Sequence, residues 1–443
     1  MGATARPAGG AVVLRGKLAR ALSASAAIAA CIALAACGGG ADASTAHGGA
    51  VAGTGPITFA TGKVDTGYLK ALTARWNASH PGQKVTVIYL PDDADDQYAQ
   101  LVANLQDHSS VYDVMSLDVI WTAGFASSGW IVPLSRRLFP LPEFLSPAVT
   151  TATYRGRLYA VPFTSNATLL YYRSDILRAA GARPPVTWAQ LAKLASTVAP
   201  RYGLGGYGTQ LQAYEGLTVN FAEAVASAGG SLLSPSGAQV TVDSAAGQQA
   251  LQFLAGGVRK GWIPMAALGW NEEASRRAFE AGQLLFLANW PYVYGDASEE
   301  GPGNVVAGKF AVTTLPGLHG PGASTLGGAN LAISAYSQHQ ATAVAFIRFL
   351  TSESSERQIL LSSALPPVWT ALYSEPSLIR RFPFLPVLRR AILTARPRPA
   401  LADYNQFSLA VSSAVHQALA GRQPVSAALT QLSSELRQIT RAG

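Results

Sequence analysis

The fold is indicated first by residues 57–117, which read ITFATGKVDTGYLKALTARWNASHPGQKVTVIYLPDDADDQYAQLVANLQDHSSVYDVMSL. Short apolar runs rich in β-branched and aromatic residues predict three strands, at 57–60, 84–90 and 112–117. The segments between them, 67–78 and 95–105, carry apolar residues at helical spacing. This β-α-β-α-β order is typical of an α/β fold with a largely parallel sheet.

The chain continues in the same pattern towards the C-terminus. Further apolar runs predict strands at 158–163, 168–172, 203–210, 284–288 and 330–333. Apolar spacing predicts helices at 174–180, 188–198, 215–228 and 245–260, and the last hundred residues are nearly all helical in pattern. A chain of this length buries a large core and usually divides into two domains.

Towards the N-terminus, residues 1–36 have the pattern of an export signal. Arg15, Lys17 and Arg20 precede an uncharged, alanine-rich run that is too short for a comfortable transmembrane helix. The run ends in Leu34-Ala35-Ala36-Cys37, which resembles the lipobox that is cut and acylated in bacterial lipoproteins. A diacylglyceryl group on Cys37 would hold the protein at the extracytoplasmic face of the cell membrane, because each buried CH₂ contributes ~0.8 kcal/mol.

After this leader the sequence is that of a globular protein of modest charge. Residues 37–56 are mostly Gly, Ala, Ser and Thr and predict a flexible tether. The net charge of the whole chain is +8, but four basic residues and no acid precede Cys37, which leaves +4 on the mature chain. Most of the basic residues are scattered, so nucleic acid is not expected as a partner.

Catalytic motifs are missing from the sequence. The six histidines are isolated, and there is no HExxH, no Gly-x-Ser-x-Gly elbow, no P-loop and no Rossmann fingerprint. We therefore expect no metal ion and no cofactor, and a binding protein rather than an enzyme. A secreted glycoside-processing enzyme stays open as an alternative, because its two carboxylates can come from any part of a sequence.

Side chains that fit a sugar lie at the ends of the predicted elements. Sugar rings stack on aromatic rings, and their hydroxyls bond to carboxylates, amides and arginine. The aromatic residues in such places are Trp121, Tyr171, Tyr172, Trp270, Trp290, Tyr292 and Trp369. Four acids, Asp92, Asp93, Asp95 and Asp96, lie before a predicted helix, where capping explains them, although one of them could also accept hydrogen bonds from a sugar. A peptide- or polyamine-binding lipoprotein is a further alternative, which the aromatic residues disfavour.

Several motifs resemble those of the carbohydrate-binding lipoproteins of ABC transporters. They are Asp113-Val114-Met115-Ser116-Leu117-Asp118-Val119-Ile120-Trp121, Leu158-Tyr159-Ala160-Val161-Pro162-Phe163, Leu170-Tyr171-Tyr172-Arg173, Tyr214-Glu215-Gly216-Leu217, Ala278-Phe279-Glu280-Ala281-Gly282, Asn289-Trp290-Pro291, Gly327-Gly328-Ala329-Asn330-Leu331 and Leu365-Pro366-Pro367. They run through nearly the whole mature chain in the order of that family. The combination is most similar to actinobacterial trehalose-binding lipoproteins and to trehalose/maltose-binding proteins.

The resemblance implies a two-lobed periplasmic-binding-protein fold of the class II type, in the α/β class. A cleft would lie between the lobes, and hinge segments would cross from one lobe to the other. We expect an N-terminal lobe formed by residues 57–163 with roughly 300–355, and a C-terminal lobe formed by 164–299 with roughly 356–443.

The resemblance also implies a set of ligand contacts. Asp118, Asn166 and Glu215 would hydrogen-bond sugar hydroxyls, and Trp290 would stack on a glucose ring. Gly328 would let the backbone approach the sugar, and Arg396 would make a forked contact with adjacent hydroxyls. Further expected contacts are Tyr404, Trp270 and Asp96. Each has a structural alternative, such as a helix cap for Asp118 or a core position for Trp290.

One loop departs from the family pattern. Residues 61–65, Thr-Gly-Lys-Val-Asp, match no motif of the family, so Lys63 and Asp65 are weaker candidates for contacts. A change in this loop would alter which disaccharide fits.

The implied function is that of the substrate-binding subunit of an ABC sugar importer. Its first expected ligand is trehalose, followed by maltose and maltodextrins and then by another oligosaccharide. The expected partners are permease and ATPase subunits, together with the membrane through the lipid on Cys37, and the protein itself is expected to be a monomer.

Overall fold

The computed structural model of the protein describes residues 52–62, 66–234 and 237–442. The predicted signal peptide, Cys37 and most of the predicted tether lie outside these residues, as do Lys63 and Asp65. Within the described ranges, no helix is both long enough and apolar enough to cross a membrane.

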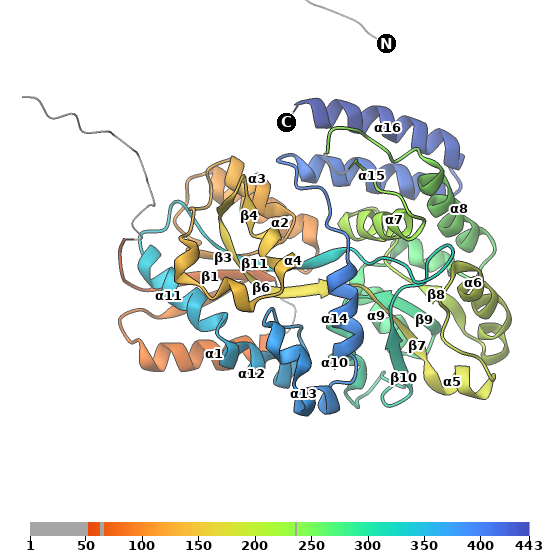
Figure 1. Ribbon diagram of the computed structural model, residues 1–443, viewed down its shortest axis with the longest axis horizontal. Coiled ribbons are helices and arrows are strands. Elements are labelled where there is room, and N and C mark those ends of the chain that lie inside the picture. The colour runs from red at the N-terminus through yellow and green to blue at the C-terminus, as the bar shows by residue number, and fades with distance from the viewer. Residues whose placement is uncertain (1–51, 63–65, 235–236, 443) are drawn as a thin grey trace, which may run out of the picture. The chain divides into compact units, whose positions relative to one another are not determined.

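A five-stranded sheet contains the first strands of the chain (Figure 1). In spatial order its strands are β2 (Val85–Leu90), β1 (Ile57–Gly62), β3 (Val114–Asp118), β11 (Leu326–Ile333) and β6 (Ala160–Ala167). β1 runs parallel to β2 and β3, as predicted, whereas β11 runs antiparallel to β3 and β6. Parallel pairing is therefore confined to β2, β1 and β3. β6 runs in the same direction as these strands, because β11 is antiparallel to both β3 and β6, so β11 is the reversed strand of this sheet.

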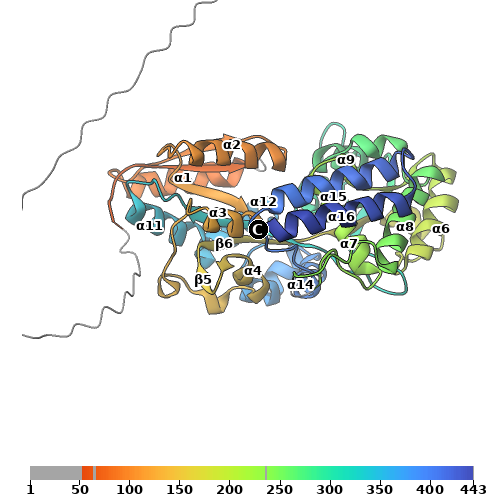
Figure 2. The same ribbon diagram turned by 90° about the horizontal axis from the view of Figure 1, so that it is seen from above.

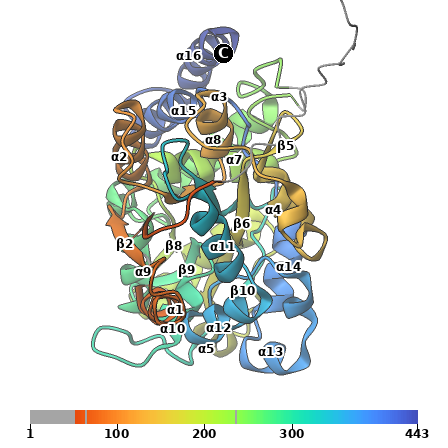
Figure 3. The ribbon, with the colours of Figure 1, turned by 90° about the vertical axis from the view of Figure 1, so that its left-hand side faces the viewer.

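Helices lie on both sides of this sheet, as Figures 1 and 3 show. On one side are α1 (Thr66–Ser79), α11 (Gln340–Leu350) and α12 (Glu353–Ser363), and on the other are α2 (Ala94–Gln106) and α3 (Trp121–Ser127). α4 (Ser146–Thr151) packs on β6 and precedes the short hairpin of β4 (Thr153–Tyr154) and β5 (Arg157–Leu158). Aromatic rings fill the core, where Phe346 of α11 meets Phe59 of β1 at 5.8 Å and Trp76 of α1 at 5.4 Å.

A four-stranded sheet contains the middle of the chain. In spatial order its strands are β10 (Phe310–Thr313), β7 (Leu169–Arg173), β9 (Leu284–Asn289) and β8 (Gly205–Gly208). The helices of this part are α5 (Ser174–Ala179), α6 (Trp188–Thr197), α7 (Glu215–Ser227), α8 (Ala245–Arg259), α9 (Glu272–Glu280) and α10 (Val293–Ser298). β9 is apolar except for its last residue and is buried along its whole length, which fits its place between two neighbouring strands.

The C-terminal part is helical, as predicted. After α12 follow α13 (Pro376–Arg381), α14 (Leu385–Thr394), α15 (Tyr404–Leu419) and α16 (Val425–Ala442). α15 packs against both α7 and α16, and Figure 2 shows α15 and α16 side by side.

Three connections lead from elements of one sheet to those of the other. Thr168 joins β6 to β7, residues 314–325 join β10 to β11, and residues 395–403 lead from α14, which packs on β6, to α15, which packs on α7. The connections meet, because Ser324 Oγ donates to the Thr168 carbonyl at 2.7 Å and Thr325 forms a parallel bridge with Arg396. The lobe boundaries given above remain a proposal.

Candidate ligand-binding site

A buried arginine links the two parts of the chain. Arg398 lies in the third connection, and its side chain is only 1% exposed. Its Nη2 donates to Asp118 Oδ1 at 3.0 Å, and its Nη1 donates to Glu215 Oε1. Asp118 ends β3 of the first sheet, and Glu215 begins α7, which follows β8 of the second. One guanidinium therefore bonds to a carboxylate from each part.

Glu215 is enclosed by hydrogen-bond donors. Tyr404 Oη donates to its Oε1 at 2.9 Å, and Ser408 Oγ donates to its Oε2, both from the start of α15. Burial raises the pKa of Glu215, and Arg398 opposes the rise. Burial alone would lower the pKa of Arg398, but Asp118 and Glu215 raise it. Glu215 is thus fixed in place, whereas Asp118, with a side chain 25% exposed, is the open end of the cluster.

The first residues of β11 lie beside Asp118. The carbonyl of Gly328 accepts a hydrogen bond from the N–H of Val119, at 3.3 Å. Gly328 has a φ of +128°, and a Cβ there would lie 2.2 Å from the Thr164 carbonyl oxygen. Only glycine fits this position, so the backbone of β11 stays uncovered by a side chain at this point.

Trp290 and Asn166 lie at the same end of β11. The register sets Asn166 opposite Gly327, and the ring of Trp290 packs so close that a Cβ on Gly327 would lie 2.7 Å from it. Asn166 Oδ1 and Arg398 Nε are buried and have no hydrogen-bond partner among the described residues. Buried polar atoms are nearly always bonded, so these two indicate a place where a bound molecule or water completes the structure.

The acidic loop before α2 contributes one further carboxylate. Asp93 Oδ1 accepts from the N–H of Asp95 at 2.9 Å and caps α2, as the capping interpretation predicted. Burial, with added repulsion from Glu215, Asp93 and Asp96, raises the pKa of Asp95 to about 7. Asp95 therefore lies within electrostatic reach of Glu215, and Asp96 is exposed on α2.

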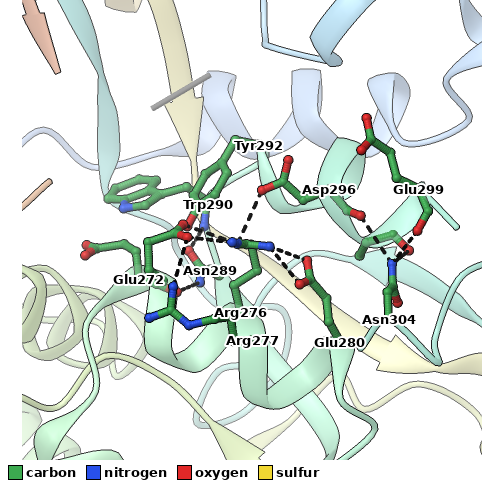
Figure 4. A network of polar contacts seen from close by, with 12 residues as sticks. Glu272, Arg276, Arg277, Glu280, Asn289, Trp290, Tyr292, Asp296, Glu299 and Asn304 are labelled. Atoms are coloured by element: carbon green, nitrogen blue, oxygen red, sulfur yellow. Dashed lines mark hydrogen bonds and ion pairs between the residues drawn. The ribbon is translucent and has the colours of Figure 1, made fainter. Parts of the chain in front are cut away.

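An ionic and aromatic network surrounds Arg276 of α9, as Figure 4 shows. Glu272, in the first turn of α9, accepts from Tyr214 Oη, and the next residue, Glu273, accepts from Tyr292 Oη at 2.7 Å. Arg276 holds the carboxylates of Glu273, Glu280 and Asp296 at 2.6, 2.7 and 3.3 Å. α9 thus presents one glutamate to Tyr214 and the other to Tyr292.

The predicted contact residues fall into two groups. Asp118, Glu215 and Tyr404 share one cluster, and β11 brings Gly328, Asn166 and Trp290 next to it. Three others lie outside the cluster. They are Asp96 on the surface of α2, Trp270, which packs near Gly208 of β8, and Arg396, which is exposed.

Arg398 and Ser408 were not predicted. Asp95 belongs to the acidic loop from which one sugar contact was expected, but Asp96 was the acid named for that contact. The chain reads Arg396-Pro397-Arg398-Pro399, so two arginines in the same sequence context compete for one role. The backbone bridge between Arg396 and Thr325 places Arg398 two residues further, in the interior. The one sequence signal for Ser408 was its spacing of four from Tyr404, which sets both on one face of α15.

Known proteins match this chain along most of its length. A family model described as bacterial extracellular solute-binding protein matches residues 61–356. A probable ABC transporter-binding protein of Deinococcus radiodurans is 33% identical over 405 residues, which cover 87% of this chain and 94% of the relative. A mannitol-binding protein of Pseudomonas aeruginosa is 24% identical over 424 residues, with 88% and 94% covered.

Solved structures agree with this result. The structure of maltose-bound T. maritima MalE3 is 32% identical and has a TM-score of 0.83, covering 87% of this chain and 99% of that one. The match confirms the predicted α/β fold of the two-lobed solute-binding type.

Proposed function

Because this chain belongs to the bacterial extracellular solute-binding protein family, we propose that it is the substrate-binding subunit of an ABC sugar importer. Its family and relatives are solute-binding proteins, which confirms the prediction of a binding protein rather than an enzyme. The observation that carries the proposal is the buried Arg398 between Asp118 and Glu215, with unpaired polar atoms on Arg398 and Asn166 beside it.

The chemistry of these residues fits sugar hydroxyls. A hydroxyl both donates and accepts, so it can bond Arg398 Nε and the open carboxylate of Asp118 at once. Asn166 Oδ1 offers an acceptor, and the bare backbone at Gly328 lets a ring come close. Trp290, half-buried, offers a ring face for stacking.

We propose trehalose as the ligand, on the strength of the trehalose-type motifs in the sequence. Maltose and maltodextrins are the second candidate, because a solved relative at 32% identity is maltose-bound. Arg398 would hold the two parts of the chain together around the sugar, since it bonds to both. No bond of the sugar is made or broken in this mechanism.

Lipid attachment at Cys37 and delivery to permease and ATPase subunits complete the proposal. The extracellular description of the family supports a location outside the cytoplasm. Expression of a Cys37→Ser variant tests the anchor. We expect the variant in the soluble extracytoplasmic fraction and the parent chain with the membranes, whereas equal membrane recovery of both would reject lipid anchoring.

Isothermal titration calorimetry of the chain without residues 1–37 tests the ligand. Trehalose, maltose, sucrose and glucose are titrated, and the recovered sugar is checked for cleavage. We expect one-to-one binding of intact trehalose and at least about tenfold weaker binding by Asp118→Asn, because a charge-assisted hydrogen bond contributes about 1.5–3 kcal/mol.

The matched control is Asp243→Asn, whose carboxylate pairs with Arg437 at 3.5 Å on the surface. It should leave affinity unchanged. If maltose binds and trehalose does not, the importer function stands and maltose replaces trehalose as the proposed ligand. If none of the four sugars binds, the proposed site is rejected.

A further inference from the structure

Arginine is concentrated in two parts of the chain. The segments 119–172 and 376–402 together contain ten arginines, no other basic residue and one acid, Glu143. Because the mature chain carries only +4, the rest of it is net acidic. The positive charge of the protein therefore belongs to these two segments.

Packing brings the two segments together. α4 of the first segment and α14 of the second both pack on β6, and Figures 2 and 3 show both helices on the same side of the molecule as β5. Leu134 forms a bridge with Leu158 of β5, which sets the short helix Arg136–Leu138 beside the hairpin of β4 and β5. We call this surface the basic side. Its arginines are Arg136, Arg137, Arg155, Arg157, Arg389 and Arg390.

The arginines of the basic side are not used within the protein. In the part of the chain that the structure describes, none of the six is in an ion pair, whereas Arg173, Arg276 and Arg357 each bind an acid. The Nε of Arg389 is buried and has no hydrogen-bond partner among the described residues. These guanidinium groups are therefore available to an anion from outside the chain.

The hairpin holds two of the arginines in place. Its turn has a φ of +46° at Arg155 and +77° at Gly156, a conformation in which asparagine or glycine is the usual residue. The guanidinium of Arg155 lies 5.2 Å from the centroid of the Tyr154 ring. Arg157 makes the same contact with Tyr159 at 5.9 Å. An arginine kept at a strained backbone position indicates that its side chain has a function.

A hollow of about 530 Å³ lies within the basic side. Arg136 and Arg137 line it, together with Phe144 and the hydroxyl residues Ser146 and Thr150. Guanidinium and hydroxyl groups match the oxygens of a phosphate, since arginine binds phosphate through a planar fork of N–H donors. The hollow therefore fits a phosphate group that is attached to a partly apolar molecule.

The opposite side of the molecule carries acids. In Figure 2, α2 and α9 lie on the side away from β5, α4 and α14. Asp92 and Asp96, at the start of α2, are exposed, and Glu272 and Glu273 begin α9. Such an uneven distribution of charge orients a protein in the field of a charged surface. An anionic surface attracts the basic side and repels the side with α2 and α9.

We propose that the basic side binds the phosphate headgroups of anionic lipids, so that the protein lies on the membrane with α2 and α9 turned towards the solvent. A bilayer matches both features of this surface, because its phosphates fit the arginines and half-buried tyrosines are enriched at its interface with water. This inference rests on the location outside the cytoplasm in the proposed function, but it does not depend on which sugar binds.

Vesicle sedimentation tests the proposal. The chain without residues 1–37, which carries no lipid of its own, is mixed with vesicles of phosphatidylcholine, either alone or with phosphatidylglycerol. We expect binding to the anionic vesicles to be at least about tenfold stronger than binding to the neutral ones. The difference should disappear at about 1 M salt, where the screening length falls to about 3 Å.

A triple variant locates the contact. It combines three exposed positions of the basic side, Arg137→Gln, Arg157→Gln and Arg390→Gln. Vesicle binding should weaken at least about tenfold, because each basic residue near an anionic surface contributes roughly fivefold. Thermal unfolding at the temperature of the parent chain shows that the variant is folded.

The matched control removes the same charge outside the two arginine-rich segments. It combines the exposed positions Arg201→Gln, Arg259→Gln and Arg422→Gln. This control should bind anionic vesicles within about threefold of the parent chain, because its arginines lie away from the contact.

The outcomes separate the membrane from other partners and from the sugar. Equal binding to neutral and anionic vesicles, or equal losses in the triple variant and the control, overturns the proposal. Binding to soluble polyglutamate without binding to anionic vesicles also overturns it and identifies an acidic protein as the partner. Sugar calorimetry on the same preparations tests the proposed function independently, since a chain that binds vesicles and no sugar keeps the basic side and rejects the sugar site.

Discussion

Arg398 carries a full charge in a place that water hardly reaches. Its removal leaves Glu215 buried beside no cation, and breaking a buried ion pair from one side costs about 3–5 kcal/mol. We expect Arg398→Met to lower the free energy of unfolding by about that amount in urea denaturation. Arg437→Met, which breaks the exposed pair with Asp243, should cost about 0–1 kcal/mol. Equal small losses in both variants would contradict the role of the buried cluster.

Glu223 is a buried acid at the place where the three connections meet. It accepts from the Thr325 N–H at 2.9 Å, and burial raises its pKa from 4.5 to about 7. Because the pKa is higher in the folded protein, protonation favours folding. This contribution is fully present below about pH 4.5 and is lost as the pH rises through about 7.

Glu223→Gln removes this proton-linked contribution. The parent chain loses this stability as the pH rises, whereas the variant does not. The difference in unfolding free energy, variant minus parent, should therefore rise by up to about 3 kcal/mol between pH 5 and pH 8, because one pKa unit corresponds to about 1.4 kcal/mol. Urea denaturation at each pH measures it. Glu435→Gln, on the exposed face of α16, is the control. A difference that stays constant with pH would show that Glu223 does not titrate in this range.

At the scale of the elements, two glycines of α8 allow a test of how tightly the first turn of this helix is packed. A Cβ on Gly247 would lie 1.8 Å from the Val242 carbonyl oxygen, whereas a Cβ on Gly256 meets nothing within 4 Å. We expect Gly247→Ala to destabilise the protein by about 1–3 kcal/mol, because the backbone has to move. Gly256→Ala in the same helix should stabilise it by about 0.5–1 kcal/mol. Thermal unfolding measures the change in melting temperature of each variant. Equal changes in both would contradict the tight packing of Gly247 against Val242.

The elements also show what the sequence could predict. Apolar runs located β1, β2 and β3, and apolar spacing located α1 and α2, each to within a residue or two, because buried apolar side chains mark all five elements. α9 was missed, since five of its nine residues, EEASRRAFE, are charged and its order depends on ion pairs around Arg276. The antiparallel position of β11 was also missed, because strand order depends on contacts that no local pattern contains.

Prediction of the site was also limited by contacts between parts of the chain that are distant in sequence. Motifs singled out Asp118 at the end of β3 and Glu215 at the start of α7, and the structure joins both to Arg398, while their contacts with a sugar stay a prediction. Arg398 was not, because the choice between two arginines depends on a backbone bridge to Thr325. A bridge between residues so far apart in sequence leaves no trace in the spacing of either.

At the scale of the whole molecule, the meeting point of the connections should affect both stability and binding. Ser324→Ala leaves the buried carbonyl of Thr168 without its 2.7 Å donor, which costs about 1–3 kcal/mol. We expect this loss in urea denaturation, with weaker sugar binding as well, because Arg398 lies on a connection bonded to Ser324. Ser127→Ala, exposed in α3, is the control for both measurements. Unchanged sugar affinity in Ser324→Ala would show that the meeting point of the connections does not influence the binding site.

The position of β11 has a consequence for the order of assembly. β3 and β6 both pair with β11 and not with each other, although β11 comes more than 150 residues later than either. While the chain is being synthesised, each of these strands keeps an unpaired edge until residues 326–333 emerge. The first sheet cannot close early. A nascent chain of this kind stays open for most of its synthesis, which is the condition in which a polypeptide can be threaded through a narrow export channel.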